Sequence, residues 1–320
     1  MEIISYDLNL DVDFRKAFVR AHQAITVKGA GKPFALDCSS IKIGSVKVNG
    51  KPSAFRQDEK RAKLFVSGVG KPKSVIEIDY TKQVSDDVIF GLYKSKYGKD
   101  YILSTDLEPS EARTVFPCVD EPAYKAVFRV QITTDTGQKV IFNTPATRVE
   151  DVGGGRTRHV FQETPRMSTY LFFFAIGNME ETKAMAGNTE VITATRPGQA
   201  ENSALALKMI AGSVQDFSKY YGVPYPLKKL HMVALPEYHT GAMENWGAIS
   251  SRESYALVTE SAAFGQKNRG AMSMVHEVAH QWFGDLVTMK WWDDLWLNES
   301  FATFMGYKMT GRLRPEWNMQ

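Results

Sequence analysis

The sequence predicts an α+β protein with more than one domain: an all-β domain of twisted antiparallel sheets, followed by a mixed domain of strands and helices. Three observations support this prediction. The chain has 320 residues, which exceeds the usual size of a single domain. Short segments of alternating apolar and polar residues fill residues 1–182, and segments of helical periodicity are prominent in residues 183–320. We expect the domain boundary between these two ranges.

The first domain shows the pattern of half-buried strands. Apolar and polar residues alternate over residues 8–14 and again over residues 46–48, where Asn49-Gly50 then predicts a tight hairpin turn. Further strand-like segments lie at residues 75–80, 128–132 and 170–174. Because turn residues bound each short segment, we expect antiparallel sheets in this domain.

The second domain begins with a strand at residues 189–193 and a helix from about residue 204 to residue 220. The prolines of segment 222–226 end this helix, because proline has no backbone N–H to donate. A further strand is expected at residues 230–235, and further helices within residues 271–290 and 295–309.

The composition is that of an ordinary globular protein, with 43% hydrophobic and 23% charged residues. The net charge of +3 is small and the basic residues are scattered, which argues against nucleic-acid binding. No segment approaches the roughly eighteen apolar residues of a membrane span, and the first residues lack the pattern of a signal peptide. We therefore expect a cytoplasmic protein, in which Cys38 and Cys118 are buried thiols.

The segment His276-Glu277-Val278-Ala279-His280 has the pattern H-E-x-x-H. Two imidazoles four residues apart lie on one face of a helix and can bind one metal ion. The carboxylate of Glu277 points beside the metal, where it can take a proton from a water molecule. The alternative is a surface helix with two solvated histidines, but the apolar neighbours of the motif leave little polar surface.

A catalytic zinc site needs a third protein ligand. Phe283 and Leu286 occupy the positions where one class of zinc peptidases has glycine and a third histidine, so that class is excluded. Glu299 remains, on the helix expected over residues 295–309, where Leu297, Phe301 and Phe304 stand at helical spacing. For this helix, Asp293 or Asp294 is a candidate N-cap. The second domain is thus expected to be the first part of a thermolysin-like α/β zinc catalytic domain, with a further lobe following Gln320.

The segment Gly241-Ala242-Met243-Glu244-Asn245 has properties suited to binding a peptide. The glycine permits close backbone approach and Ala242 adds little bulk, so an extended peptide can pair here as an added strand. Glu244 offers a carboxylate that can bind an ammonium group. An anchor of this kind near a zinc ion confines cleavage to the first peptide bond.

These residues together resemble the aminopeptidase N family of zinc peptidases. The resemblance rests on segment 241–247 and on H-E-x-x-H with Glu299, and it is strongest to the archaeal tricorn-interacting-factor aminopeptidases. It extends to residues 116–122 and 167–171 in the β domain. It implies one Zn²⁺ per chain, Glu277 as general base and acid, and Glu108 as a second carboxylate that binds the substrate amine. It also implies peptide substrates with a free N-terminus and a larger cytosolic protease system as partner.

The resemblance further implies a downstream tyrosine that stabilises the oxyanion. This chain does not contain it, since Tyr307 lies on the Glu299 helix, where we expect it to pack. Poor turnover is therefore expected from the 320 residues alone. Alternatives to an aminopeptidase are a zinc endopeptidase, a catalytically impaired peptide-binding fragment and an epoxide hydrolase. Hydrolysis of a free amino-acid amide, compared with its N-acetylated form, separates exopeptidase from endopeptidase.

Overall fold

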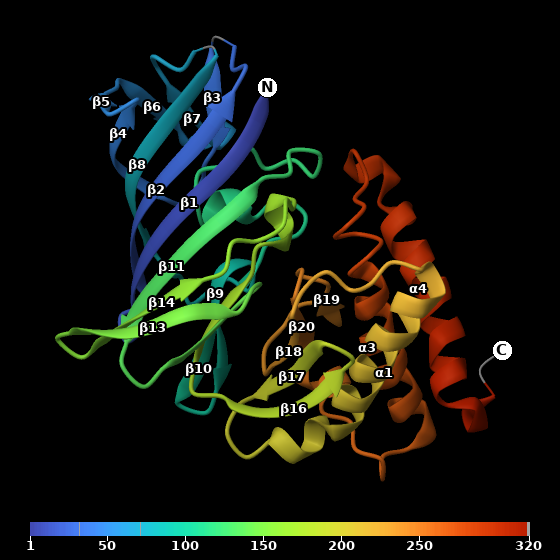
Figure 1. Ribbon diagram of the computed structural model, residues 1–320. Coiled ribbons are helices and arrows are strands. Elements are labelled where there is room, and N and C mark those ends of the chain that lie inside the picture. Colours follow the sequence, from blue (N-terminus) through green and yellow to red (C-terminus); the bar gives the residue numbers. More distant parts are fainter. Residues whose placement is uncertain (32, 71, 319–320) are drawn as a thin grey trace. The chain divides into compact units, whose positions relative to one another are not determined.

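The computed structural model describes residues 1–318, apart from residues 32 and 71. The chain, coloured from blue to red in Figure 1, divides into two compact units. The first consists of Met1–Lys94, Leu103–Val140 and Thr144–Phe172, and the second of Ser95–Ile102, Ile141–Asn143 and Phe173–Gln320. Within the described residues, no helix combines the length and the apolar character needed to cross a lipid bilayer.

The first unit is built around a large sheet with the strand order β13-β14-β11-β1-β2-β8-β4-β5. β1 runs antiparallel to β2 and parallel to β11. The all-β character predicted for this part of the chain is confirmed, with a parallel pair among antiparallel ones. The bounds are β1 Glu2–Asp13, β2 Phe18–Lys28, β4 Lys42–Val48, β5 Lys51–Pro52, β8 Lys73–Gln83, β11 Val127–Asp135, β13 Ala146–Gly153 and β14 Arg156–Phe161.

A smaller sheet of the first unit has the order β3-β7-β6. Its strands are β3 Phe34–Asp37, β7 Lys63–Val66 and β6 Phe55–Asp58. Three strands contain residues of both units: β9 Gly91–Tyr97, β10 Asp100–Asp106 and β12 Lys139–Phe142. Short 3-10 helices of the first unit are η1 Glu59–Arg61, η2 Ala112–Thr114 and η3 Thr169–Leu171.

The alternation in β1 places every second side chain in the core of the first unit. Leu8, Leu10 and Val12 are at most 4% exposed, whereas Asn9 is exposed. Packed rings extend this core, with centroids of neighbouring rings 4.9 to 5.9 Å apart, among Tyr6, Phe116, Phe128 and Phe172. Cys38 and Cys118 are buried free thiols, as expected.

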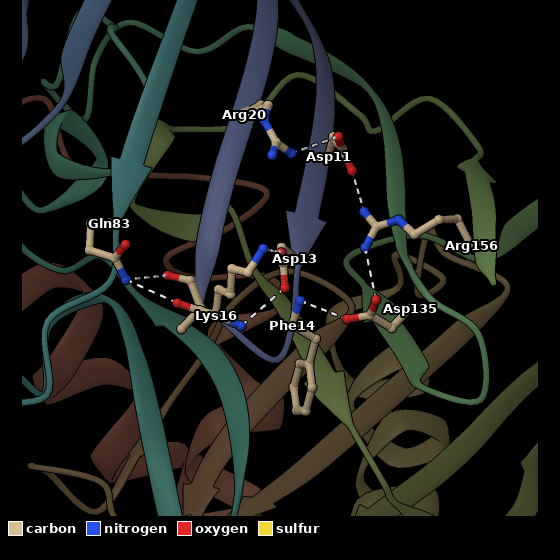
Figure 2. Close-up of polar contacts among 9 residues, drawn as sticks. Asp11, Asp13, Phe14, Lys16, Arg20, Gln83, Asp135 and Arg156 are labelled. Atoms are coloured by element: carbon tan, nitrogen blue, oxygen red, sulfur yellow. Dashed lines mark hydrogen bonds and ion pairs between the residues drawn. The ribbon is translucent and has the colours of Figure 1, made fainter. Parts of the chain in front are cut away.

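Charged side chains hold the end of β1 to its neighbours, as Figure 2 shows. The backbone N–H of Phe14 donates to the carboxylate of Asp135 at 2.9 Å. Arg156 Nη1 lies 3.1 Å from Asp135 Oδ1, and its Nη2 pairs with Asp11. Arg156 thus connects β14 with β1 and β11, and Asp135 also binds the first residue after β1.

The second unit contains a sheet with the order β16-β17-β18-β20-β19, in which β18 runs parallel to both β17 and β20. Its strands are β16 Glu180–Ala186, β17 Thr189–Thr195, β18 Lys229–Leu235, β19 Ala242–Met243 and β20 Ala248–Arg252, and β15 Phe174–Gly177 precedes them. The helices are α1 Ala204–Tyr221, α2 Glu253–Ala256, α3 Phe264–His280 and α4 Trp296–Leu313, with 3-10 helices η4 Ala200–Ser203, η5 Trp292–Asp294 and η6 Pro315–Trp317. The predicted helix at 204–220 and strand at 230–235 are confirmed.

The core of the second unit lies between its sheet and the helices α1, α3 and α4, which run from yellow to red in Figure 1. α1 contributes Met209 and Phe217, α3 contributes Met274 and Val278, and α4 contributes Met305. Each of these side chains is at most 1% exposed. This packing fixes α3 against α4, the two helices that carry the predicted metal ligands.

Details of the second unit differ from expectation. Residue 182, the expected domain boundary, lies inside β16, because the polar segment there pairs with β17 as an edge strand. The N-cap of α4 is Leu295, without a side-chain hydrogen bond, so the N-cap expected at Asp293 or Asp294 is wrong.

The expectation that Tyr307 packs is also wrong. Its side chain is 49% exposed, because α4 buries the face that carries Ala302, Met305 and Met309. Leu297 and Phe304 are exposed for the same reason.

Candidate active site

His276 and His280 lie on one face of α3, one turn apart. Their Nε2 atoms are 2.9 Å from each other, and the rings meet edge to face with centroids 4.5 Å apart. The apolar residues between and before them, Val278 and Met274, are fully buried in the core. The amphipathic pattern of α3 therefore orients both imidazoles toward the same point.

α4 brings Glu299 to the two histidines. Its Oε2 lies 3.4 Å from His276 Nε2, and its Oε1 lies 3.6 Å from His280 Nε2. The helices approach closely because Gly306 has no side chain: a β-carbon there would lie 3.4 Å from the β-carbon of His276. One ligand atom from each of His276, His280 and Glu299 lies within 4.8 Å of the other two.

Two further carboxylates lie beside His280. Donor atoms of Glu244, Glu277 and His280 all lie within 4.8 Å of one another, and each residue is at most 5% exposed. Glu244 Oε1 is 3.9 Å from His280 Nδ1. In the part of the chain that the structure describes, this buried oxygen has no hydrogen-bond partner. It is therefore an available acceptor next to the histidine cluster.

The segment around Glu244 forms the edge of the sheet. Ala242 and Met243 make up β19, which pairs with β20 at the end of the strand order. The carbonyl of Gly241 accepts from Arg252 N at 2.9 Å, and Asn245 Nδ2 donates to Ser250 Oγ at 3.0 Å. These bonds orient the segment with one side toward β20 and the other side at the sheet edge.

Family models match both parts of the chain. Residues 3–171 match the Peptidase M1 N-terminal domain, and residues 205–320 match the Peptidase family M1 domain. The chain belongs to peptidase family M1. It is 41% identical over 318 residues to a leucyl aminopeptidase of Saccharolobus solfataricus, covering 99% of this chain and 40% of that protein.

Other relatives of this M1 chain have similar coverage. It is 38% identical over 317 residues to the tricorn protease-interacting factor F2 of Thermoplasma acidophilum, covering 99% of this chain and 40% of that protein. It is 36% identical over 323 residues to an aminopeptidase N of Lactobacillus helveticus, covering 98% of this chain and 38% of that protein. The chain thus spans about 40% of the length of the curated relatives that it matches.

M1 peptidases bind zinc, and the arrangement in this chain suits that ion. The carbonyl of Phe283 lies 2.9 Å from His280 Nδ1, so Nδ1–H donates to it and Nε2 is the ring nitrogen left to bind an ion. Burial by itself lowers the pKa of His280, but the carboxylates of Glu244 and Glu299 outweigh burial and raise it. Burial likewise raises the pKa of Glu299, but hydrogen bonds to the two histidines hold that pKa well below its usual range. A divalent cation matches this concentration of negative charge.

The remaining predicted site residue, Glu108, follows β10 in the first unit. Its expected role in binding the substrate amine stays a prediction.

Two residues near the histidines were not singled out from the sequence. Thr303 Oγ1 lies 3.4 Å from His276 Nδ1, and Gln281 is a fully buried amide directly after His280. The sequence did offer one indication for Gln281, because it is a polar residue that follows the apolar face of a helix. A polar side chain buried at such a position must be hydrogen bonded.

Proposed function

We propose that this M1 chain carries the zinc site of an aminopeptidase that hydrolyses the N-terminal peptide bond of peptides. The observation that carries this proposal is the buried carboxylate oxygen of Glu244, which has no hydrogen-bond partner in the described structure and lies 3.9 Å from His280 Nδ1. A free N-terminal ammonium group is the ligand that best neutralises such an oxygen. An endopeptidase does not require this anchor.

His276, His280 and Glu299 would hold the ion in this proposal. Zinc bound there would polarise the scissile carbonyl and lower the pKa of a water molecule. Glu277 then accepts the proton of the attacking water and returns it to the leaving amine. Its buried position near His280 suits this role, because a carboxylate away from bulk water exchanges a proton directly with the reacting groups.

Glu244 and Glu108 would bind the ammonium group, and residues Gly241, Ala242, Met243 and Asn245 would line the substrate. The edge position of β19 supports this assignment, because an edge strand offers backbone groups to an added extended peptide. Holding the ammonium group and the neighbouring backbone of the substrate in this way supplies part of the rate acceleration through positioning.

The names of the relatives support the same class of substrate. Two of them are aminopeptidases by name, and another is named as a factor that interacts with tricorn protease. We propose that the present protein likewise acts on peptides from a larger protease system. A cytoplasmic location fits the free thiols of Cys38 and Cys118.

Metal analysis and hydrolysis together test this function. The protein should bind one zinc ion and slowly hydrolyse leucine 4-nitroanilide, but not its N-acetylated form. Glu277→Gln should keep the zinc and lose hydrolysis by a factor of about a hundred or more. Glu244→Gln should weaken binding of the free amine. Equal hydrolysis of blocked and unblocked substrates would show an endopeptidase, and unchanged hydrolysis by Glu277→Gln would refute the mechanism.

A further inference from the structure

The side chain of Gln281 connects the end of α3 to the segment that carries Glu244. Its Nε2 donates to the carbonyl of Glu244 at 2.9 Å. Its Oε1 accepts from the backbone N–H of Gly247 at 3.0 Å and from the hydroxyl of Tyr225 at 3.1 Å. The side chain is 0% exposed, so these bonds form away from water.

The segment from Glu244 to Gly247 lies between β19 and β20 and has irregular backbone. Gly247 has a φ of +77°, and a β-carbon there would lie 2.3 Å from the carbonyl oxygen of Asn143. Buried peptide groups outside regular structure must find partners among backbone groups, side chains or water. In this segment Gly247 O accepts from His231 N at 3.0 Å, and Asn245 O accepts from Ala248 N at 2.8 Å. Side chains bind other peptide groups of the segment and so help to determine where the backbone, and therefore the Glu244 carboxylate, lies.

Two further side chains bind the same segment. Asn143 Nδ2 donates to the carbonyl of Trp246 at 2.9 Å, and Lys229 Nζ donates to the carbonyl of Gly247 at 2.8 Å. Gln281 binds the same segment from α3. Because it directly follows His280 in sequence, it connects the backbone of Glu244 to a predicted metal ligand through one side chain.

We propose that Gln281 is a positioning residue that fixes the carboxylate of Glu244 relative to His280. This inference rests on the proposed function, because it assigns the Glu244 carboxylate to the substrate amine. The relevant spacing is the 3.9 Å between Glu244 Oε1 and His280 Nδ1. A displacement of about 1 Å at such an anchor is enough to reduce turnover a hundredfold, so loss of the Gln281 amide acts through the position of Glu244 rather than through the metal.

Gln281→Met tests this role, because methionine keeps the length of the side chain and removes the amide. The dissociation constants of zinc and of L-leucinamide are measured by calorimetry on zinc-loaded protein. The parent protein and every variant carry Glu277→Gln in these measurements, so that the site keeps its zinc but does not hydrolyse the amide. We expect leucinamide binding to weaken about tenfold or more, while the zinc dissociation constant changes less than threefold. The matched control is Tyr225→Phe, which removes one bond to the same amide but keeps both backbone contacts. It should change leucinamide binding less than twofold.

A double-mutant cycle separates positioning from a general structural effect. In the Glu244→Gln background, adding Gln281→Met should weaken leucinamide binding less than twofold, since the group that it positions is already altered. Independent losses that multiply in the double variant would overturn the proposal. So would Gln281→Met binding leucinamide as well as the parent protein does.

Two outcomes distinguish this inference from the proposed function. If the parent protein binds zinc but not leucinamide, the aminopeptidase assignment fails. If the parent binds leucinamide and Gln281→Met binds it equally, only the positioning role fails. Should Gln281→Met not fold, Gln281→Glu takes its place, because glutamate keeps the acceptor for Gly247 N–H and loses the donor to Glu244. The same selective loss of leucinamide binding is expected, and its absence refutes the role.

Discussion

Gly306 of α4 lies directly against His276 of α3, so that a β-carbon on the glycine would lie 3.4 Å from the β-carbon of the histidine. Met272 Sδ is equally close, at 3.3 Å. The distance between the two ligand-bearing helices therefore depends on the absence of a side chain at this position.

Gly306→Val should move α4 away from α3 and weaken zinc binding about tenfold or more, because Glu299 moves with its helix. Competition with a fluorescent chelator measures this affinity. Gly265→Val is the matched control, since Gly265 also lies in a helix but a β-carbon there meets nothing within 4 Å. If both variants bind zinc equally well, the close approach at Gly306 does not determine the metal site.

Removal of zinc should lower the thermal unfolding midpoint, because the ion binds the folded state and joins α3 to α4. At a free zinc concentration one hundred times the dissociation constant, the stabilisation is about 2.7 kcal/mol. Differential scanning calorimetry with and without a chelator measures the shift. Glu299→Gln should unfold at nearly the same temperature in both conditions, and a large zinc-dependent shift in that variant would contradict the ligand assignment.

His231 should make the protein sensitive to mild acid. Burial, together with the positive charge of Lys229, lowers its pKa to about 3, although Glu181 opposes this shift. The unfolded chain therefore binds a proton below about pH 6.5 that the folded chain does not, so stability falls as the pH falls from 6.5 toward 3. Between pH 7 and pH 5 the loss from this group is about 2 kcal/mol.

Urea unfolding of His231→Gln at both pH values tests this expectation. The variant should lose about 2 kcal/mol less than the parent over that interval. Equal losses in the parent and in His231→Gln would show that other groups cause the acid sensitivity.

Arg156→Ala should destabilise the first unit by about 1 kcal/mol, because Arg156 pairs with both Asp11 and Asp135 and is only 21% exposed (Figure 2). Lys16→Ala removes an ion pair whose lysine is 77% exposed and should have an effect close to zero. Denaturant unfolding compares the two variants. Equal effects would mean that the Arg156 network contributes no more than an ordinary surface pair.

Local patterns predicted much of the second unit. The spacing of apolar residues and prolines predicted α1 and β18, and these elements form as expected. The burial of α4 could not be predicted in this way, because its residues are apolar on more than one face. Packing against α3 selects the face with Ala302 and Met305, so Phe304 is exposed.

By itself, the sequence determined the geometry within one helix: His276 and His280 share a face because a helix repeats every 3.6 residues. It also identified Glu299, Glu277 and Glu244 as candidates by their chemistry and spacing. Only the tertiary structure decided which buried groups stabilise that arrangement. Gln281 binds residues 34 to 37 positions away in the chain. No local pattern encodes such a contact, since it arises when α3 packs against the sheet and an irregular backbone segment requires hydrogen-bond partners away from water.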